Sequence, residues 1–241
     1  MKARILCTTL LLVGFSVVNF SCKDEEVFTE TPEKPSDIFP ITLCPTLIKN
    51  VTGLFPESQN NRDKYSQIFA DASQQQIVLT KDTEVYVTFV TEGAAMGNVL
   101  GYYIYNNNST PGSPDEIQKE LIFPNIDNTV LTPGDTRQLG SSSLKAGTVI
   151  GFFLIVAGYR NDGVYFKRPT SYTNQNWNTD QAKQHVLFRE NECGSIVVGF
   201  EDKNSATADK DYNDVIFMVS DNKSSLENTS FDLQTVVSLS K

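Results

Sequence analysis

Short apolar segments separated by turn residues recur along the chain after residue 80. In these segments apolar and polar side chains alternate, or nearly every residue is apolar, which is typical of β-strands that bury one or both faces. Gly, Pro, Asn and Asp, which favour turns, lie between them. The segments span residues 85–90, 99–105, 120–123, 149–157, 164–167, 184–189, 195–200 and 215–219. About ten strands with little helix predict an all-β fold, an antiparallel β-sandwich of jelly-roll type.

Three segments refine this picture. Residues 149–157 are apolar on both faces, which predicts a central strand, and the segment is too short for a membrane-spanning helix. Residues 231–239 alternate between apolar and polar side chains, which predicts one further strand at a sheet edge. Residues 63–72 carry apolar side chains at helical spacing, and this is the only helix we expect.

The first 21 residues have the features of an export signal. Two basic residues precede an apolar stretch at 10–18, and no acidic residue is present. Ser21 stands directly before Cys22, as in the lipobox of bacterial lipoproteins, so we expect cleavage after Ser21 and a lipid on Cys22. The acidic cluster at 23–26 resembles the signal that directs lipoproteins of some Gram-negative bacteria to the outer face of the outer membrane. The sequence therefore predicts a protein anchored in the outer membrane through Cys22 and facing the cell exterior.

Composition and charge narrow the range of partners. Residues 22–40 are rich in Glu, Thr and Pro and are expected to form an extended, poorly packed tether, which leaves residues 41–241 for the β-sandwich domain. The formal net charge is −9, and loss of Lys2 and Arg4 with the export signal makes it −11. Such an acidic chain argues against nucleic acid as a partner.

Cys44 and Cys193 are the two cysteines outside the export signal and the lipid anchor. In an oxidising compartment they could form a disulfide, or both could stay as buried free thiols. Neither has the spacing of a metal-binding Cys-x-x-Cys pair. The sequence contains no geometry that decides between pairing and free thiols.

The stretch 201–214 is strongly acidic and lies between two predicted strands. It holds five carboxylates and two lysines, so the lysines alone cannot neutralise it. Such a group of carboxylates is stable either in contact with open water or when its oxygens bind a hard cation. The candidate calcium ligands are Glu201, Asp202, Asp209, Asp211, Asn213 and Asp214.

The spacing within this stretch allows side chains to converge on one ion. Asp209, Asp211 and Asn213 occupy alternate positions, as do the first three ligands of an EF-hand loop. The rest of that pattern is absent, because Asp214 replaces its Gly and no Glu follows at its last position. A lone run of this kind is usually a solvated turn, but the opposed acidic pair at 201–202 favours calcium.

The two halves of this acidic motif resemble a bacterial family, a domain of unknown function found in secreted and surface proteins. Its hallmark is Gly-Phe-Glu-Asp followed, after a short loop, by Asp-x-Asp-Tyr/Phe-Asn-Asp, and these stand here at 199–202 and 209–214. The resemblance covers about residues 80–221. Similar segments stand at 92–103, 151–154 and 184–186. It implies an extracellular β-sandwich with a calcium site and no established activity. The uncharged insert at 204–208 departs from the family's Gly-rich turn.

Three other sets of residues are candidates for catalysis or ligand binding. Glu201 and Asp209 could be cast as a glycosidase pair, but that reaction needs one carboxyl in an apolar pocket, whereas these lie in a polar loop. His185, the only histidine, belongs to no recognisable catalytic motif and is expected to be structural. Trp177 and Tyr172, among Asn and Gln side chains, are candidate glycan contacts; the alternative is a loop that the Trp ring holds against the core.

The sequence thus predicts a calcium-binding, non-catalytic lipoprotein at the cell surface that serves binding or adhesion, with glycans as candidate ligands. The alternative is a surface accessory lipoprotein that assembles with a protein partner, and a glycan-active hydrolase is the least favoured class. An exposed aromatic and amide surface near Trp177 would favour glycans, whereas a broad apolar patch would favour a protein partner.

Overall fold

The computed structural model describes residues 28–94, 96–203, 206–223 and 228–241. The predicted export signal, the lipid site at Cys22 and the acidic cluster at 23–26 lie outside these residues and stay predictions. None of the helices in the described ranges is long and apolar enough to cross a membrane.

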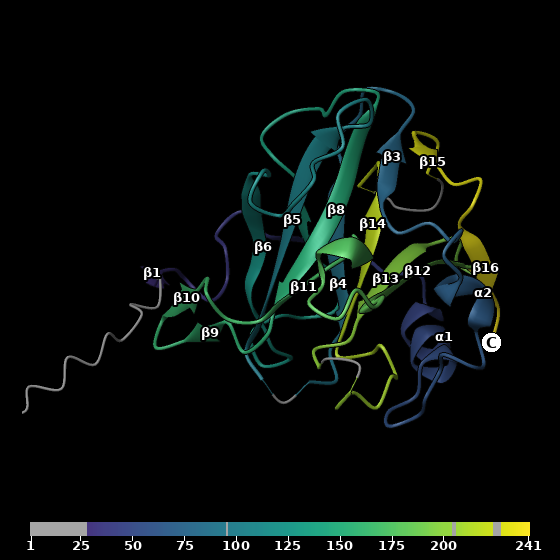
Figure 1. Cartoon of the computed structure of the whole chain (residues 1–241), viewed down its shortest axis with the longest axis horizontal. Coiled ribbons are helices and arrows are strands. Elements are labelled where there is room, and N and C mark those ends of the chain that lie inside the picture. Colours follow the sequence, from purple (N-terminus) through teal and green to yellow (C-terminus); the bar gives the residue numbers. More distant parts are fainter. Residues whose placement is uncertain (1–27, 95, 204–205, 224–227) are drawn as a thin grey trace, which may run out of the picture.

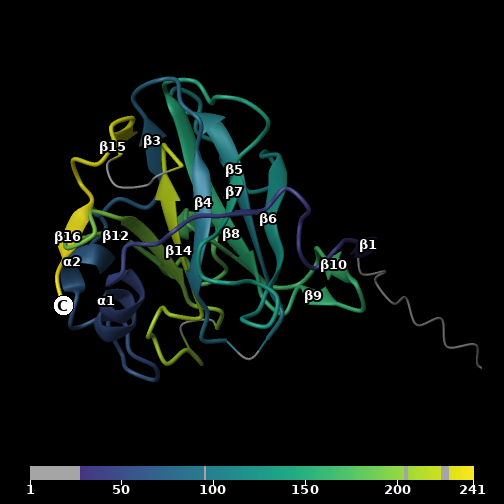
Figure 2. The same ribbon diagram turned by 180° about the vertical axis from the view of Figure 1, so that it is seen from behind.

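Two large sheets pack face to face and form the body of the protein (Figures 1 and 2). The six-stranded sheet contains, in spatial order, β15 (Phe231–Asp232), β3 (Ile77–Leu79), β8 (Thr148–Ile155), β5 (Asn98–Asn106) and β6 (Lys119–Ile126), with β11 (Thr170–Tyr172) paired to β8. The seven-stranded sheet contains, in spatial order, β16 (Val237–Leu239), β12 (His185–Glu190), β13 (Ile196–Phe200), β14 (Val215–Ser220), β4 (Tyr86–Thr91), β7 (Asp135–Gln138) and β2 (Phe39–Pro40). Neighbouring strands are antiparallel except β12 and β16. The predicted all-β sandwich is confirmed.

The described residues contain sixteen strands, more than the ten or so expected. Many of the additional strands, such as β9 (Tyr159–Arg160) and β11, are only two or three residues long. A strand this short pairs through its backbone and is too short to show an alternating side-chain pattern. The longer strands were foreseen, and β8 lies between β3 and β5, so the prediction of a central strand at 149–157 is confirmed.

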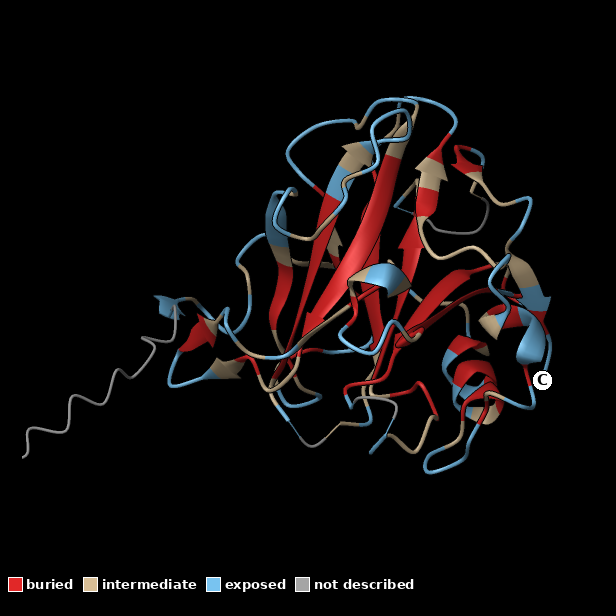
Figure 3. Ribbon diagram, in the orientation of Figure 1, coloured by how far each residue is buried: buried red, intermediate tan, exposed pale blue. Residues whose placement is uncertain are grey.

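Apolar side chains from both large sheets fill the space between them. Phe152 of β8 and Phe217 of β14 meet there, with ring centroids 4.9 Å apart. Both rings are buried, as are the central strands as a whole (Figure 3). Burial of this apolar surface is the main favourable contribution to folding.

Two helices cover the outer face of the seven-stranded sheet (Figure 1). α1 (Leu47–Leu54) buries its apolar side chains against this face, and α2 (Ser66–Phe69) follows it in the chain. The expectation of a single helix at 63–72 is therefore wrong: α2 lies inside that range, and α1 is an additional helix. Two β-branched residues and a glycine at 51–53 are poor helix formers, which weakens the sequence signal of α1 although its apolar residues recur at helical spacing.

Cys44 and Cys193 form a disulfide, with Cα atoms 5.9 Å apart. It joins the segment before α1 to the turn between β12 and β13. Because the two cysteines are 149 residues apart in sequence, the bond restricts the unfolded chain, by about 4 to 5 kcal/mol in the chain-entropy model. The structure therefore has the paired form of the two alternatives.

The C-terminal tail does not form one continuous strand. β15 and β16 belong to different sheets, and a turn at 233–236 separates them, in which Val236 N donates a hydrogen bond to Leu233 O. Leu233 and Val236 both pack against the central core. The prediction of one edge strand over 231–239 is wrong, because this turn carries the chain from the edge of one sheet to the edge of the other.

The described part of the predicted tether is attached to the domain. β1 (Phe28–Glu30) pairs with β10 (Gly163–Tyr165) in a small sheet with β9, which projects from the sandwich in Figure 1. β2 pairs with β7, and the side chains of Lys34 and Asp135 form an ion pair. Backbone pairing thus attaches residues 28–30 and 39–40 to the domain, although none of residues 28–40 is buried.

Candidate metal centre

The acidic stretch 201–214 joins β13 to β14 at the end of the sandwich where the yellow-green loop of Figure 1 lies near α1. The two strands are antiparallel neighbours, and Phe200 is paired with Val215. Glu201 follows this pair and Asp214 precedes it, so the two acidic residues start from opposite positions. The register of two apolar strands thus brings their carboxylates together.

Three carboxylates at this junction, those of Glu201, Asp202 and Asp214, form a group that we call the buried trio. One oxygen of each lies within 4.8 Å of the others. Glu201 is 1% exposed and Asp202 is 5% exposed. Asp202 N donates to Asp214 Oδ2 at 2.7 Å, and Lys210 N donates to Glu201 Oε2 at 3.1 Å. Asn98 Nδ2 donates to Asp202 Oδ2 at 3.1 Å, so β5 of the opposite sheet also holds the trio.

The buried trio carries negative charge that no ion pair with a described residue neutralises. Among the described residues, Glu201 Oε1 and Asp202 Oδ1 are buried and accept no hydrogen bond. The ion pairs within the described ranges lie elsewhere: Lys34–Asp135, Arg137–Asp37 and Lys145–Asp82. Burial of an unpaired charge is strongly unfavourable, so the trio requires either protons or a cation.

The raised pKa values of Glu201 and Asp214 correspond to the first alternative, in which protons neutralise the trio. Burial raises the pKa of Glu201 to about 7, and the charges of Asp209 and Asp211 contribute to this shift. Burial also raises the pKa of Asp214 to about 9, with a further contribution from the charge of Asp202. A proton held between Glu201 and Asp214 relieves the repulsion, and a divalent cation can take the place of that proton.

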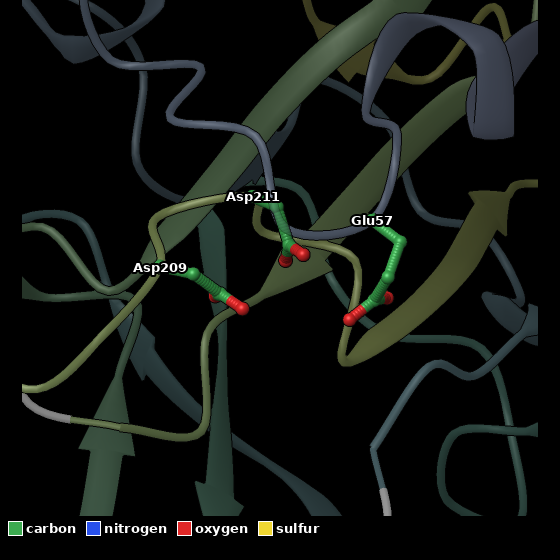
Figure 4. A group of neighbouring side chains, drawn as sticks. All are labelled: Glu57, Asp209 and Asp211. Atoms are coloured by element: carbon green, nitrogen blue, oxygen red, sulfur yellow. The ribbon is translucent and has the colours of Figure 1, made fainter.

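A second acidic group, which we call the helix-side cluster, consists of Glu57, Asp209 and Asp211 (Figure 4). One oxygen of each lies within 4.8 Å of the others. Glu57 comes from the connection between α1 and α2 and is exposed, Asp209 is at least partly exposed, and Asp211 is 1% exposed. Burial raises the pKa of Asp211, and the charges of Asp209 and Glu57 add to it. This cluster therefore joins the helical segment to the acidic stretch.

The backbone of the acidic stretch turns sharply between these groups. Lys210 and Tyr212 have φ values of 68° and 60°, in the left-handed region that non-glycine residues rarely adopt. The buried ring of Tyr212 packs on Phe69 with centroids 4.7 Å apart, which holds the stretch against α2. The turn therefore holds the acidic stretch against the helical segment through Tyr212.

The structure divides the six predicted ligands between the two groups. Three form the buried trio, and Asp209 and Asp211 belong to the helix-side cluster. Asn213 lies close to the latter: its backbone N donates to Asp211 Oδ1 at 3.2 Å, and its Nδ2 donates to Phe55 O at 3.1 Å. The Oδ1 of Asn213 is buried and has no partner among the described residues. The geometry thus favours two small groups over one group of six.

Two residues that take part in these groups were not predicted. Glu57 is far from the acidic stretch in sequence, and a single exposed Glu in a helical connection carries no signal for a site. Asn98 is fully buried at the start of β5, where its Oδ1 also accepts a hydrogen bond from Ala157 N at 2.9 Å. An asparagine that begins an otherwise apolar strand is the signal that could have identified it, since a buried amide needs specific partners.

Trp177 and Tyr172 lie on the outer face of the six-stranded sheet. Tyr172 is 7% exposed, its ring lies 5.8 Å from that of Trp177, and Lys119 Nζ lies 5.3 Å from its centroid. The half-buried Trp177 ring packs on Tyr103 at 5.1 Å. This arrangement matches the alternative in which the Trp ring holds its loop against the core, and it leaves Tyr172 no open face for a sugar.

His185 lies in β12 and has no exposed surface. Burial, together with the charge of Lys183, lowers the pKa of His185 to about 3. The ring is therefore neutral at physiological pH.

A cavity of about 690 Å³ lies beside the buried trio. Asp202 and Lys203 are part of its lining, together with amide and hydroxyl side chains of the segments around β11 and before β12. These amide and hydroxyl side chains include Thr170, Ser171, Asn178, Thr179 and Gln184. Its volume is within the range of about 300–1,000 Å³ found for small-molecule sites.

Residues 144–222 match the model of a family described as Domain of unknown function (DUF4114). The match runs from just before β8 to just after β14, so it includes the buried trio but neither Glu57 nor Asn98. No curated protein and no solved structure gives a match to the chain. The resemblance expected over residues 80–221 is thus supported for its second half, as similarity to a family of unknown function.

Proposed function

We propose that this protein is a calcium-stabilised, non-catalytic binding module, carried at the cell surface by a lipid on Cys22. The observation that carries the proposal is the buried trio, three converging carboxylates of which two oxygens accept no hydrogen bond among the described residues. All available ligands are oxygens, which suit calcium, a hard cation that takes about six to eight of them. Glu201 Oε1, Asp202 Oδ1 and a carboxylate oxygen of Asp214 would be its protein ligands.

Calcium in the buried trio would couple binding to folding. Its ligands come from the end of β13 and the start of β14, so they are gathered only when these strands pair. At a calcium concentration a hundred-fold above Kd, the ion would stabilise the folded protein by about 2.7 kcal/mol if the unfolded chain does not bind it. For a domain of this size that corresponds to a rise in Tm of roughly 5–10 °C.

A glycan is the ligand that the surroundings of the trio favour. The cavity beside Asp202 combines hydroxyl groups, such as that of Thr179, which can donate to and accept from a sugar, with the apolar surface of Val156, Pro169 and Ala206, on which the apolar face of a sugar can pack. A protein partner, the alternative, would prefer a continuous apolar patch. The large apolar side chains that are exposed in the described residues come from separate elements: Phe28, Ile48, Met96, Ile104 and Phe166.

A thermal melt tests the calcium site. The wild-type protein should melt higher in calcium than in chelator, and Asp214→Asn should reduce that difference because it removes a charged ligand of the trio without changing side-chain size. Asp115→Asn, the same substitution at an exposed position, should keep it. Equal melting temperatures of the wild type in calcium and chelator would refute the calcium site.

A glycan array tests the binding function separately. The domain should bind a defined class of glycans, and Thr179→Arg should abolish binding because it places a long side chain in the cavity, whereas Thr129→Arg, on an exposed turn elsewhere, should not. Binding that Thr179→Arg leaves intact would place the ligand elsewhere. An array without any signal, together with a stable complex with another surface protein, would support the accessory-lipoprotein alternative.

A further inference from the structure

Beside the helix-side cluster lies an amide oxygen that has no hydrogen-bond partner among the described residues. Asn213 is 8% exposed, and its Nδ2 is fixed on Phe55 O, which directs Oδ1 the other way. This Oδ1 is buried and has no partner among the described residues. Buried polar atoms are almost always hydrogen-bonded, so an orphaned one needs an explanation.

The orphaned Asn213 oxygen faces the same space as Glu57. A methyl group placed on the Cα of Gly93 would lie 2.6 Å from Asn213 Oδ1 and 3.2 Å from Glu57 Oε2. Both side chains line a cavity of about 190 Å³, to which Glu92 also belongs. Asn213 Oδ1 therefore shares this small space with one carboxylate of the cluster, that of Glu57, whose oxygen also lies within 4.8 Å of oxygens of Asp209 and Asp211.

We propose that Glu57, Asp209, Asp211 and Asn213 Oδ1 form a second divalent-cation site, separate from the buried trio, which takes calcium. Three carboxylates and an amide oxygen suit a hard cation, and the exposure of Glu57 allows water to complete its coordination. Its ligands come from the connection between α1 and α2 and from the acidic stretch. Glu57 lies outside the residues that match the family model. The site goes beyond the proposed function, because it neither requires nor shares the carboxylates of the trio.

An ion in the helix-side site would link the connection between α1 and α2 to the acidic stretch 201–214. Hydrogen bonds already connect them: Ser58 N donates to Asp211 Oδ2, Asn213 Nδ2 to Phe55 O, Asn61 N to Lys210 O and Asn61 Nδ2 to Asp211 O. These bonds leave the mutual repulsion of Glu57, Asp209 and Asp211 in place, and a cation removes it. Calcium bound here should therefore protect the connection between α1 and α2 from local opening.

Calorimetric titration of the full chain, purified in detergent and stripped with chelator, tests this site with calcium chloride alone. The wild type should bind two equivalents, and Glu57→Gln should bind one. Asp214→Asn should also bind one, the ion that stays in the helix-side site. Glu33→Gln, the same change at an exposed position elsewhere, should bind two.

Limited proteolysis supplies a second readout that depends only on the helix-side site. Cleavage after the exposed Lys64 should be slowed by calcium in the wild type and in Asp214→Asn, and unaffected by calcium in Glu57→Gln. Two equivalents bound by Glu57→Gln would overturn the second site. A single wild-type equivalent that Asp214→Asn removes and Glu57→Gln keeps would also overturn it while supporting the buried trio. Loss of one of two equivalents in Glu57→Gln, but none in Asp214→Asn, would support the second site and refute the trio.

Discussion

The hairpin of β13, β14 and the acidic stretch between them contains two opposite kinds of buried residue. In the middle of the pair, the Phe217 ring packs between those of Phe152 and Phe200, at 4.9 and 6.3 Å. Directly after the paired end of β13, Glu201 is just as buried, but it is a carboxylate with an oxygen that accepts no hydrogen bond in the described part of the chain. Apolar burial is favourable without any further group, whereas carboxylate burial requires a proton or a cation from solution.

This difference implies that the stability of the apolar middle and that of the acidic end of the hairpin depend on different variables. The apolar middle should respond to side-chain volume and ignore calcium and pH. The acidic end should respond to calcium and pH, and only weakly to volume. The four predictions that follow separate these responses, beginning with the largest.

Phe217→Ala should destabilise the protein by about 3–5 kcal/mol, because it removes a buried ring and leaves a cavity between the sheets. The loss should be the same in calcium and in chelator, as measured by urea unfolding. Phe166→Ala, at a side chain that is 37% exposed, is the matched control and should have a much smaller effect. A Phe217→Ala loss that calcium largely restores would contradict the separation of the two regions.

The calcium-free protein should lose stability as pH rises from 5 to 8. The pKa of Glu201 is raised from 4.5 to about 7 in the folded state, so the folded protein holds more protons than the unfolded chain in this range. Stability is then full below pH 4.5 and decreases through pH 7, by on the order of 3 kcal/mol for a shift of this size. Asp214, whose pKa is raised to about 9, acts in the same direction.

Calcium should reverse this pH dependence, because its ligands must be deprotonated. Urea unfolding at a series of pH values, in chelator and in calcium, measures both slopes. Chelator-treated protein that is more stable at pH 8 than at pH 5 would show that the trio does not hold an extra proton.

Asn98→Ala should destabilise the protein by about 1–3 kcal/mol, because Asp202 then loses a buried hydrogen bond to a charged group. The effect of calcium on Tm should remain, since Asn98 holds a ligand and is not one itself. Asn128→Ala, at an exposed asparagine that bonds Glu92, is the control and should cost less. If Asn98→Ala is as stable as the wild type, Asp202 does not depend on this contact.

The sequence predicts the apolar middle of the hairpin better than its acidic end. Long strands such as β8 and β14 have alternating or fully apolar patterns, and the adjacency of Glu201 and Asp214 follows from the register of two neighbouring strands. The division of the acidic residues follows from left-handed backbone at Lys210 and Tyr212, which no pattern of residue types indicates. Glu57 reaches the site through packing of the helical segment, a contact between distant parts of the chain. Local periodicity therefore predicts the strands and brings the six acidic and amide residues to one loop, but it predicts neither their division into two groups nor the contribution of Glu57.

Gly93→Ala should have the smallest effect on stability, below about 1 kcal/mol, and still disturb the helix-side site. Its new methyl group would lie 2.6 Å from Asn213 Oδ1, so this oxygen must move. Because Asn213 Nδ2 is held on Phe55 O, the displacement should weaken calcium binding at the helix-side site and leave the buried trio unchanged. Titration of the Asp214→Asn background isolates that site. Gly112→Ala, whose methyl group would meet only the exposed Glu116 at 3.3 Å, is the control. An unchanged Kd in Gly93→Ala would remove Asn213 from the ligands and leave the three carboxylates alone.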